Sequence, residues 1–340
     1  MTVFNSLSLL QAIEIGTVAI TTIYHQIISY RDRQNPTPPG NLYVMADSAN
    51  KHLYTKGMGE ITVVFDHSLG GIEGYLSIAE IAKLTSVCIY DRSGYGWSQM
   101  SHSPRTSVTI VRELDELLTL ANISPPYILI GDSFGSYNMR LFAHQFPDRV
   151  AGLILTDGLH EREMLSLPLS LKILKLFFTL SFAFVSIGAS LGIVRVMGML
   201  GIFELIKPEL KRFSPIGLQH IKRSFYSANH WMTMCREMWD LDTSGQQLRT
   251  ANHLGNLPIV SIKSQTFIKP LFGLNLIALL GADRVRDQIH LNLMNLSTDS
   301  QQILASKSSH FVWIDQPELI IGAVATLLSK ISKNDSIKSA

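Results

Sequence analysis

Residues 127–136 read YILIGDSFGS: a run of apolar residues typical of a strand, then Gly-Asp-Ser-Phe-Gly, then the start of a helical pattern. The order strand, G-x-S-x-G, helix is that of a nucleophile elbow. The turn is so tight that small residues must flank the serine, and Gly131 and Gly135 do so. The pattern predicts that Ser133 Oγ projects above the strand end, where the helix dipole favours negative charge. The alternative is an ordinary turn serine.

Strand-like and helix-like segments alternate on both sides of this elbow. Such alternation predicts an α/β fold with a doubly wound, mostly parallel, eight-stranded sheet covered on both faces. The first two strands are expected to form an antiparallel pair around the turn DSANK. The expected strands cover residues 42–46, 52–56, 61–67, 86–91, 127–131, 150–156, 257–263 and 302–307, and the expected helices residues 75–84, 105–123, 136–145 and 317–331.

The alternation stops in the middle of the chain. Residues 159–254 are hydrophobic and helical in pattern, which indicates a helical cap inserted between two strands of the sheet. The α/β core then comprises residues 41–158 and 255–332. Residues 1–40 form a hydrophobic helix and a Pro-rich linker, and residues 333–340 are expected to be a frayed tail.

The N-terminal segment Val3–Tyr30 raises the question of a membrane, because Glu14 is its only formally charged side chain. It is long enough to span a bilayer, although polar residues dilute it. Two alternatives stay open, a membrane anchor or monotopic helix and an ordinary docked helix. Arg31 and Arg33 follow it, so an inserted segment would leave the catalytic domain in the cytoplasm. We therefore expect a membrane-associated protein, with a soluble cytoplasmic one as the alternative.

A second segment, Leu176–Val194, has no charged residue at all. If it crossed a bilayer once, Ser133 and any base near the C-terminus would lie on opposite sides of the membrane. A serine and its base must approach to about 3 Å. We therefore expect a cap helix that is buried over the site or lies on the membrane surface.

The overall composition excludes several classes of function. The 340 residues carry a net charge of only +2, which argues against nucleic acid as a partner. Two cysteines, Cys88 and Cys235, have neither the number nor the spacing of a disulfide framework or a metal site. No metal and no cofactor is expected.

An activated serine needs an oxyanion hole and a base. One backbone N–H should come from Phe134, directly after the serine, and another from Leu69 in the Gly-rich loop DHSLGG. The alternative for that loop is a surface turn. His310, in SSHFVWIDQPELI, follows the last expected strand and precedes the last helix, where the order serine, acid, histidine requires a base.

The acid is the least determined member. The loop after LPIVSIK, its commonest place, holds no Asp or Glu. Asp283 lies twenty-seven residues before His310 but opens an expected helix, and Asp287 is one turn further in. Asp157 ends the strand after the elbow, at the sheet edge where such folds bind ligands, so we choose it over Asp283. The alternative for Asp157 is a role in capping the following turn.

The segment YDRSGYGWSQ also follows an expected strand. A local structural role accounts for it, with Asp91 paired to Arg92 and with Tyr95 and Trp97 packed over the site entrance. It is assigned no chemical step.

The stretches VVFDHSLGG, YDRSGYGWS, GDSFGS, RVAGLILTDG and SSHFVWIDQPEL together resemble an α/β-hydrolase of the serine-hydrolase and esterase-like branch with a helical cap. Members of that branch often begin with a hydrophobic anchor helix. The chain departs from the family pattern in two places. Asp132 stands where the elbow usually has histidine, and Ser68 where the oxyanion loop often has glycine.

These features predict hydrolysis of an ester or related acyl bond in a small hydrophobic substrate, through an acyl-enzyme on Ser133. Epoxide and haloalkane hydrolysis need a carboxylate nucleophile, and a serine at position 133 disfavours them. The alternative is a non-catalytic α/β-hydrolase-fold protein that binds an apolar ligand or partner, which Asp132 and Ser68 favour. Possible membrane contact is assigned to residues 3–30 and 176–194.

Overall fold

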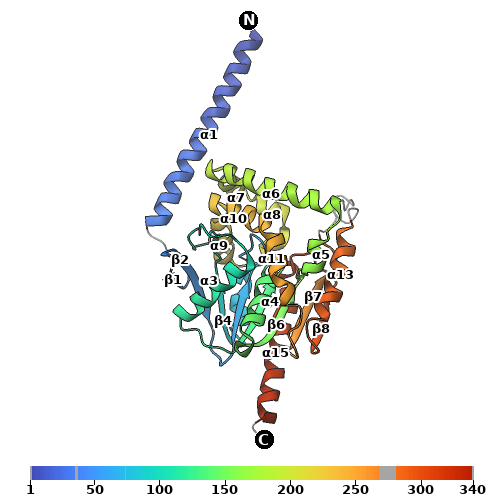
Figure 1. Cartoon of the computed structure of the whole chain (residues 1–340). Helices are drawn as coiled ribbons and strands as arrows, with labels where there is room; N and C mark the ends of the chain where they lie inside the picture. Colours follow the sequence, from blue (N-terminus) through green and yellow to red (C-terminus); the bar gives the residue numbers. More distant parts are fainter. Residues whose placement is uncertain (1, 35–36, 73, 268–280, 339–340) are drawn as a thin grey trace.

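The computed structural model describes residues 2–34, 37–72, 74–267 and 281–338 (Figure 1). Its centre is one eight-stranded sheet with the strand order β1-β2-β4-β3-β5-β6-β7-β8. The strands are β1 (Asn41–Val44), β2 (Asn50–Lys56), β3 (Thr62–Asp66), β4 (Ser86–Tyr90), β5 (Tyr127–Asp132), β6 (Val150–Thr156), β7 (Ile259–Ser264) and β8 (Ser300–Ala305).

The sheet is mostly parallel, as predicted. Only β2 pairs antiparallel, with β1 on one side and β4 on the other, while the strands from β4 to β8 run parallel. In β5, Tyr127–Asp132, every residue is buried. A strand covered on both faces must be apolar throughout, which explains why YILI reads as a continuous rather than an alternating hydrophobic run.

Helices cover both faces of the sheet, so the core is doubly wound. On one face the buried side chains of α3 (Ser107–Leu120), α4 (Gly135–Gln145) and α13 (Ala282–Met294) pack on the strands. On the other face α2 (Gly74–Ile81) and α15 (Pro317–Lys338) do so. The apolar spacing of the sequence thus forms two hydrophobic layers, one on each side of the sheet.

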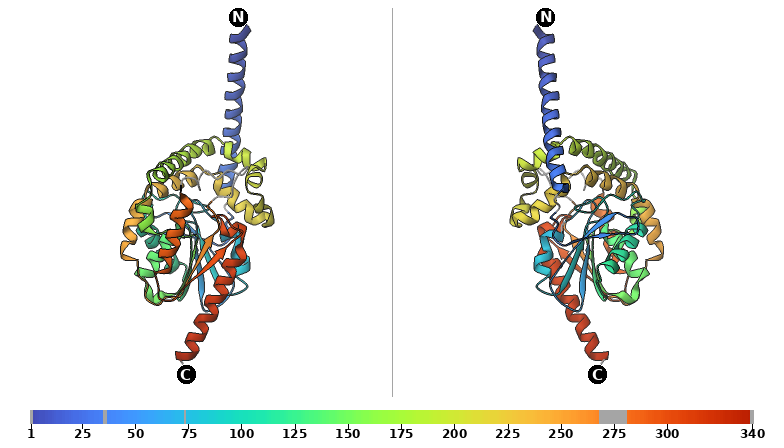
Figure 2. Two further views of the ribbon diagram at one scale, coloured as in Figure 1. Left: turned by 90° about the vertical axis from the view of Figure 1, so that its right-hand side faces the viewer. Right: turned by 90° about the vertical axis from the view of Figure 1, so that its left-hand side faces the viewer.

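The cap lies between β6 and β7 in the chain and stands over one edge of the sheet (Figures 1 and 2). The helix α6 lies across its outer side (Figure 1). The helices of the cap are α5 (Glu161–Leu165), α6 (Leu169–Ser190), α7 (Ile193–Met199), α8 (Ile202–Ile206), η2 (Pro208–Arg212), α9 (Pro215–Phe225), α10 (Ala228–Trp239), α11 (Leu241–Gln247) and η3 (Leu248–Thr250).

The charge-free segment at 176–194 is not one helix. The helix α6 ends at Ser190, and Gly192 adopts φ +80° before α7 begins. A Cβ at Gly192 would lie 2.5 Å from the backbone oxygen of Thr21 in α1. The left-handed conformation and this close approach both require glycine, which ends the helix earlier than its hydropathy predicts.

The N-terminal helix α1 (Thr2–Gln34) docks on this break. The hydroxyls of Thr21 and Thr22 donate to the Leu191 carbonyl, at 3.0 and 3.2 Å. Arg195 Nε donates to His25 Nδ1 at 3.1 Å. The earlier part of α1 projects beyond the cap (Figures 1 and 2). Within the described ranges, α6 is the one helix that is long and apolar enough to cross a membrane.

The helix α15 continues to Lys338, into the segment 333–340 that the sequence predicts to be a frayed tail. Residues 339–340 lie outside the described part of the chain. The last turns contain neither glycine nor proline, so nothing in the sequence stops the helix at residue 332.

Candidate active site

The elbow between β5 and α4 forces Ser133 into a strained conformation with φ +49°. Its N–H donates to the Thr156 carbonyl at 3.0 Å, which fixes the turn to the neighbouring strand. A Cβ at Gly131 would lie 2.6 Å from the backbone of Gly135, and one at Gly135 would lie 2.5 Å from the Asp66 carbonyl. Both glycines are therefore sterically required. Strain of this kind persists only where the surrounding structure holds it, as at functional sites.

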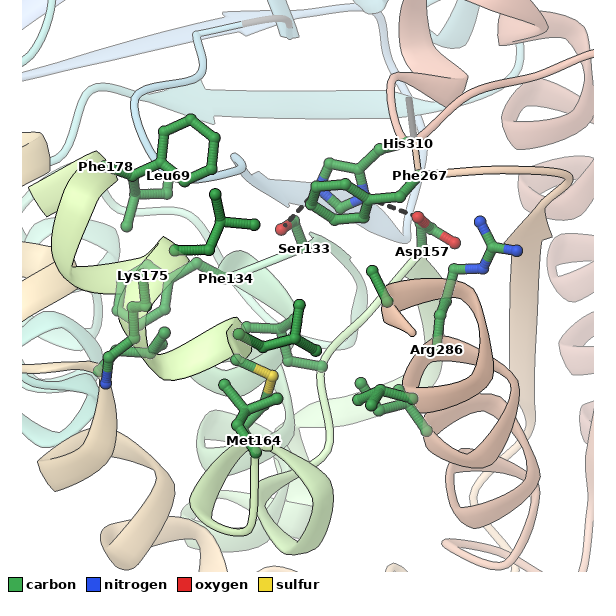
Figure 3. A pocket seen from close by; sticks show the side chains of 18 of the residues that line it. Leu69, Ser133, Phe134, Asp157, Met164, Lys175, Phe178, Phe267, Arg286 and His310 are labelled. Atoms are coloured by element: carbon green, nitrogen blue, oxygen red, sulfur yellow. Dashed lines mark hydrogen bonds and ion pairs between the residues drawn. The ribbon is translucent and has the colours of Figure 1, made fainter. Parts of the chain in front are cut away.

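The residues predicted as nucleophile, base and acid lie in one hydrogen-bonded line (Figure 3). His310 Nε2 is 2.9 Å from Ser133 Oγ, and His310 Nδ1 is 2.6 Å from Asp157 Oδ2. Ser133 and Asp157 are buried, and His310 is half-buried. This is the geometry of a serine nucleophile with its base and with an acid that orients the base.

Asp283, the alternative acid, is engaged elsewhere. Its Oδ1 accepts a hydrogen bond from the N–H of Phe267 at 3.2 Å and lies 3.3 Å from Arg286 Nη1. Asp287 is more exposed and pairs with Lys263. The imidazole of His310 is instead held by Asp157, so the geometry favours the carboxylate at the strand end.

Asp157 has a second histidine partner, His290, which the sequence analysis missed. His290 Nε2 donates to Asp157 Oδ1 at 3.1 Å, and Ser264 N–H donates to the same oxygen at 3.0 Å. The hydroxyl of Ser261 lies 3.0 Å from His290 Nδ1. The Ser261 hydroxyl can donate to Nδ1, and the imidazole N–H then lies on Nε2 and points at Asp157. The available signal was a lone histidine on the buried face of α13.

These contacts control the charge of the acid. Burial alone would raise the pKa of the Asp157 carboxyl, but the hydrogen bonds from His290 and His310 outweigh it and hold that pKa far below its ordinary value. Asp157 is therefore ionised at neutral pH, as the orienting member of such a site must be.

The two residues predicted to form the oxyanion hole, Leu69 and Phe134, both line the cavity above Ser133. Among the described residues, neither backbone N–H donates to a protein acceptor. Unpaired amides are rare in protein interiors, and amides of this kind can receive negative charge from a ligand. The oxyanion role of these two amides stays a prediction.

The loop that carries Leu69 is held by Arg92. Its guanidinium donates to the carbonyls of His67 and Ser68, at 2.8 and 2.9 Å. It also pairs with Asp66 at 2.6 Å and, across the core–cap boundary, with Glu237 of α10 at 2.9 Å. Burial would lower the pKa of Arg92, but Glu237 and Asp66 hold it well above its ordinary range. The ion pair thus ties the oxyanion loop to the cap.

The expected pairing of Asp91 with Arg92 is wrong. Asp91 Oδ2 lies 3.0 Å from His52 Nδ1 and accepts from Tyr75, because the two side chains leave the strand end in different directions. Tyr95 donates to Glu237 at 2.7 Å and accepts from Gly70 N–H. Its hydroxyl therefore connects Gly70 of the oxyanion loop to Glu237 of the cap.

Trp97 packs under Arg223, with the guanidinium carbon 3.4 Å from the ring centroid. Neither Tyr95 nor Trp97 is among the described residues that line the cavity. The expectation that Tyr95 and Trp97 pack over the site entrance is therefore wrong. Both residues support the loop and the cap instead.

Comparison with known proteins agrees with this geometry. A family model for the alpha/beta hydrolase fold matches residues 61–182. The solved structure of the epoxide hydrolase CorEH superposes with a TM-score of 0.61 over 86% of this chain and 98% of that one, at 15% identity. The chain has the α/β-hydrolase fold.

Other proteins resemble this chain over most of its length. The enol-lactonase of Burkholderia xenovorans LB400 has a TM-score of 0.56 at 14% identity and covers 85% of this chain and 100% of its own. YqjL of Bacillus subtilis (strain 168), an uncharacterized protein, is 23% identical over 270 residues, 78% of this chain and 83% of its own.

A shorter match concerns YNL115C, an uncharacterized vacuolar membrane protein of Saccharomyces cerevisiae (strain ATCC 204508 / S288c). It is 28% identical over 127 residues, 35% of this chain and 19% of its own length. At these identities the solved structures show the fold alone.

The cavity of this α/β-hydrolase above Ser133 has a volume of about 190 Å³, and most of its walls are apolar. That is larger than the roughly 150 Å³ that accommodates benzene in an engineered apolar cavity. Core and cap both contribute, with Leu69, Phe134, Met164, Leu171, Phe178 and Phe267 among the lining residues (Figure 3).

Two charged residues at the cavity wall are already paired. Lys175 Nζ bonds to Asp242 at 2.7 Å, and Arg286 donates to the carbonyl of Gln265. Phe267 stacks on the His310 imidazole, with ring centroids 4.7 Å apart. Across the described ranges, no group of three His, Cys, Asp or Glu residues could hold a metal ion. The reactive polar groups that face the cavity are therefore those around Ser133.

Proposed function

We propose that the protein is a serine hydrolase that cleaves an ester, or a related acyl bond, of a small hydrophobic substrate. The observation that carries the proposal is the line Ser133–His310–Asp157 at the wall of an apolar cavity, with bonds of 2.9 and 2.6 Å. A hydroxyl bonded to an imidazole, which is oriented in turn by a carboxylate, is an activated nucleophile.

The reaction proceeds in two halves. Ser133 Oγ bonds to the acyl carbon while its proton passes to His310 Nε2, and the oxyanion accepts from the amides of Leu69 and Phe134. The bond to the alcohol then breaks, and His310 returns the proton to the leaving oxygen. Water repeats the sequence on the acyl-enzyme and releases the acid. Asp157 holds the imidazole in place and stabilises its cation throughout.

A serine nucleophile favours acyl transfer over epoxide opening. One similar structure is an epoxide hydrolase and another an enol-lactonase. Epoxide and haloalkane hydrolysis use a carboxylate at the elbow, and this chain has Ser133 there. A lactone is an internal ester, so the lactonase chemistry is the nearer of the two to the proposed reaction.

The shape and polarity of the cavity support a hydrophobic acyl or alcohol group. Its apolar walls favour binding by burial of hydrocarbon, and the two cations among the described lining residues, Lys175 and Arg286, are already paired. The volume of about 190 Å³ favours a group of roughly the size of an aromatic ring or short chain.

A fluorophosphonate probe tests the proposal directly, because only an activated serine reacts quickly with it. The folded wild-type protein should label at Ser133, and Ser133→Ala should abolish both labelling and hydrolysis of p-nitrophenyl esters. Ser166→Ala, which removes an exposed cap serine, is the matched control and should label normally. A chain-length series of the esters would then define the acyl group.

The alternative is a non-catalytic binding protein for an apolar ligand. Asp132 and Ser68, which depart from the family pattern beside the nucleophile, favour it. Absence of labelling in folded protein, together with binding of an apolar dye in the cavity, would establish this alternative in place of the hydrolase.

A further inference from the structure

The outward side of α6 is built from large apolar residues. Seven of them are between 50% and 77% exposed, and their spacing of mostly three or four residues places them on one side of the helix. They are Leu169, Ile173, Leu176, Phe177, Leu180, Phe184 and Ile187. A cap helix that faced water would carry charged or polar residues there.

The inward side of the same helix mixes small polar residues with large apolar ones. Thr179, Ser186 and Ala189 are its buried residues beyond the first turn, while Phe178 lines the cavity and Phe182 packs on Trp231 of α10. The Ser186 hydroxyl donates to the Ala228 carbonyl of α10 at 2.9 Å. The helix α6 is therefore apolar on both sides, whereas the outer helix of a water-soluble cap has a polar outward side.

The apolar surface continues past the end of α6. The next cap helices expose four residues by 63–73%, so the surface is broader than one helix. We call these residues and the seven of α6 the outer cap face. The four are Met199, Leu200, Leu205 and Ile206. Contiguous exposed apolar surfaces of this extent mark contact with a membrane or a partner.

The direction of α1 distinguishes between these occupants. Its later part, from Thr21 onward, docks on the cap, and its earlier part projects away from the molecule on the side of the outer cap face (Figures 1 and 2). In Figure 1 the axis of α1 is steeply inclined to the axis of α6. Residues 2–20 would rise by about 28 Å as a helix, close to the ~30 Å of a bilayer's hydrocarbon core.

The charges near the outer cap face also suit a bilayer. Between residues 169 and 211 the chain has five lysines or arginines and two glutamates. None of these charged residues lies between Lys175 and Arg195, where the apolar surface is continuous. Lys172 and Lys211 are exposed at the margin of this surface, where basic residues can meet lipid headgroups, while Lys175, Arg195 and Lys207 are paired within the protein.

We propose that the outer cap face rests on a lipid bilayer, with the projecting part of α1 inserted into it, and that the site takes its ester substrate from that bilayer. The substrate part of this inference rests on the proposed function. The bond between Ser133 and His310 excludes the other arrangement, in which α6 crosses the membrane once between them.

One helix separates the bilayer from the cavity in this arrangement. Leu174 and Phe178 of α6 line the cavity, while Phe177 and Leu180, their neighbours in the sequence, face outward. A helix with its side chains is about 10 Å across. A hydrophobic ester dissolved in the leaflet that contacts the outer cap face would therefore reach Ser133 by passing α6, without crossing water.

A labelled full-length chain tests the contact with the bilayer. Phe184→Cys and, as the matched control, Met58→Cys would each carry the fluorophore NBD in a Cys235→Ser background. Met58 is 92% exposed and leads into the opposite end of β3. In vesicles of phosphatidylcholine and phosphatidylglycerol, spin-labelled lipid should quench the probe at 184 several-fold more than at 58.

Equal quenching at the two positions would overturn the bilayer contact. Contact of the probe at 184 with a second copy of the chain would also overturn it. Such contact would appear as self-quenching of the probe. The self-quenching would persist when labelled chains are diluted with lipid and would be lost when they are diluted with unlabelled chains. Either outcome leaves the proposed hydrolysis untouched, because neither measurement depends on turnover.

Substrate supply is tested by Phe177→Glu combined with Phe184→Glu, against Met58→Glu combined with Leu120→Glu as the control. None of these side chains lines the cavity. The cap variant should hydrolyse a soluble short-chain p-nitrophenyl ester at the wild-type rate, but a long-chain ester embedded in vesicles about tenfold or more slowly, because charged side chains no longer enter the interface.

Wild-type rates of the cap variant on both esters would overturn the inference while leaving the hydrolase proposal intact. If the wild-type protein hydrolysed neither ester, the proposed function itself would be wrong. The two failures are therefore distinguishable.

Discussion

The α/β core and the cap differ in what they expose. In β5 of the core every residue is buried, and the apolar side chains of α3 and α4 point at the sheet. In α6 of the cap large apolar residues lie on both sides, with Phe178 at the cavity and with Phe177 and Phe184 63% and 77% exposed. The core encloses its apolar residues, whereas the cap presents many of its own to the surroundings.

The boundary between these regions includes a buried ionic cluster, in which Arg92 of the core bonds to Glu237 of the cap and to the oxyanion loop. A shift of the cap would therefore disturb the loop that carries Leu69. The line of Ser133, His310 and Asp157 comes entirely from the core.

The largest expected effect lies in the core. Asp157→Asn should lower kcat about 10⁴-fold with folding retained, because the imidazole loses the acceptor that fixes its tautomer. Asp283→Asn is the control and should leave kcat within a few-fold, since Asp283 binds Phe267 and Arg286. Ester hydrolysis and circular dichroism measure the two quantities. If Asp283→Asn had the severe effect, the acid would have to be reassigned.

The next effect lies at the boundary. Glu237→Gln removes one charge from a buried pair and should lower the free energy of unfolding by about 3 kcal/mol. It should also lower kcat more than it raises KM, because Arg92 holds the oxyanion loop. Urea unfolding and steady-state kinetics measure both.

The control for this variant is Glu80→Gln, which weakens the exposed pair with Lys83 on the surface of the core. It should cost between about 0 and 1 kcal/mol and leave kcat unchanged. Equal effects of the two variants would mean that the cap and the oxyanion loop are not coupled.

The smallest expected effect is confined to the cap and depends on pH. Burial lowers the pKa of His230 from 6.5 to about 3 in the folded protein. Between these values the unfolded chain binds a proton that the folded one does not, so stability falls as pH falls below 6.5. Wild type should therefore lose about 2 kcal/mol more than His230→Asn between pH 7.5 and 5.

Urea titrations at the two pH values measure this difference. His230→Asn keeps a polar group near Ser224, which bonds to His230 Nδ1 at 2.8 Å. An identical loss of stability in both proteins would mean that this histidine is not what makes the cap sensitive to acid.

Local sequence was sufficient wherever the chemistry depends on neighbours in the chain. The elbow around Ser133 needs a strand, two glycines and a helix, all within ten residues, and it forms as predicted. The eight-stranded, mostly parallel sheet followed from the alternation of strand and helix, because that pattern has few packed solutions. His310 was found from its position after the last strand.

Only the tertiary structure decided the contacts between distant segments. The sequence left Asp157 and Asp283 as competing acids, since spacing along the chain does not say which carboxylate reaches an imidazole. His290 meets Asp157 across 133 positions and Arg92 meets Glu237 across 145. Such pairs depend on how α13 and α10 pack, which no local pattern specifies.

In the cap, too, some features follow from the sequence and others only from the folded structure. Composition alone established that residues 176–194 are free of charge, but hydropathy does not say which side of a helix faces outward. The folded structure decides this, because α10 accepts a hydrogen bond from Ser186 and so turns Phe177 and Phe184 away from the protein. It also ends α6 at Ser190, just before Gly192, where the left-handed conformation and the docked α1 both require glycine.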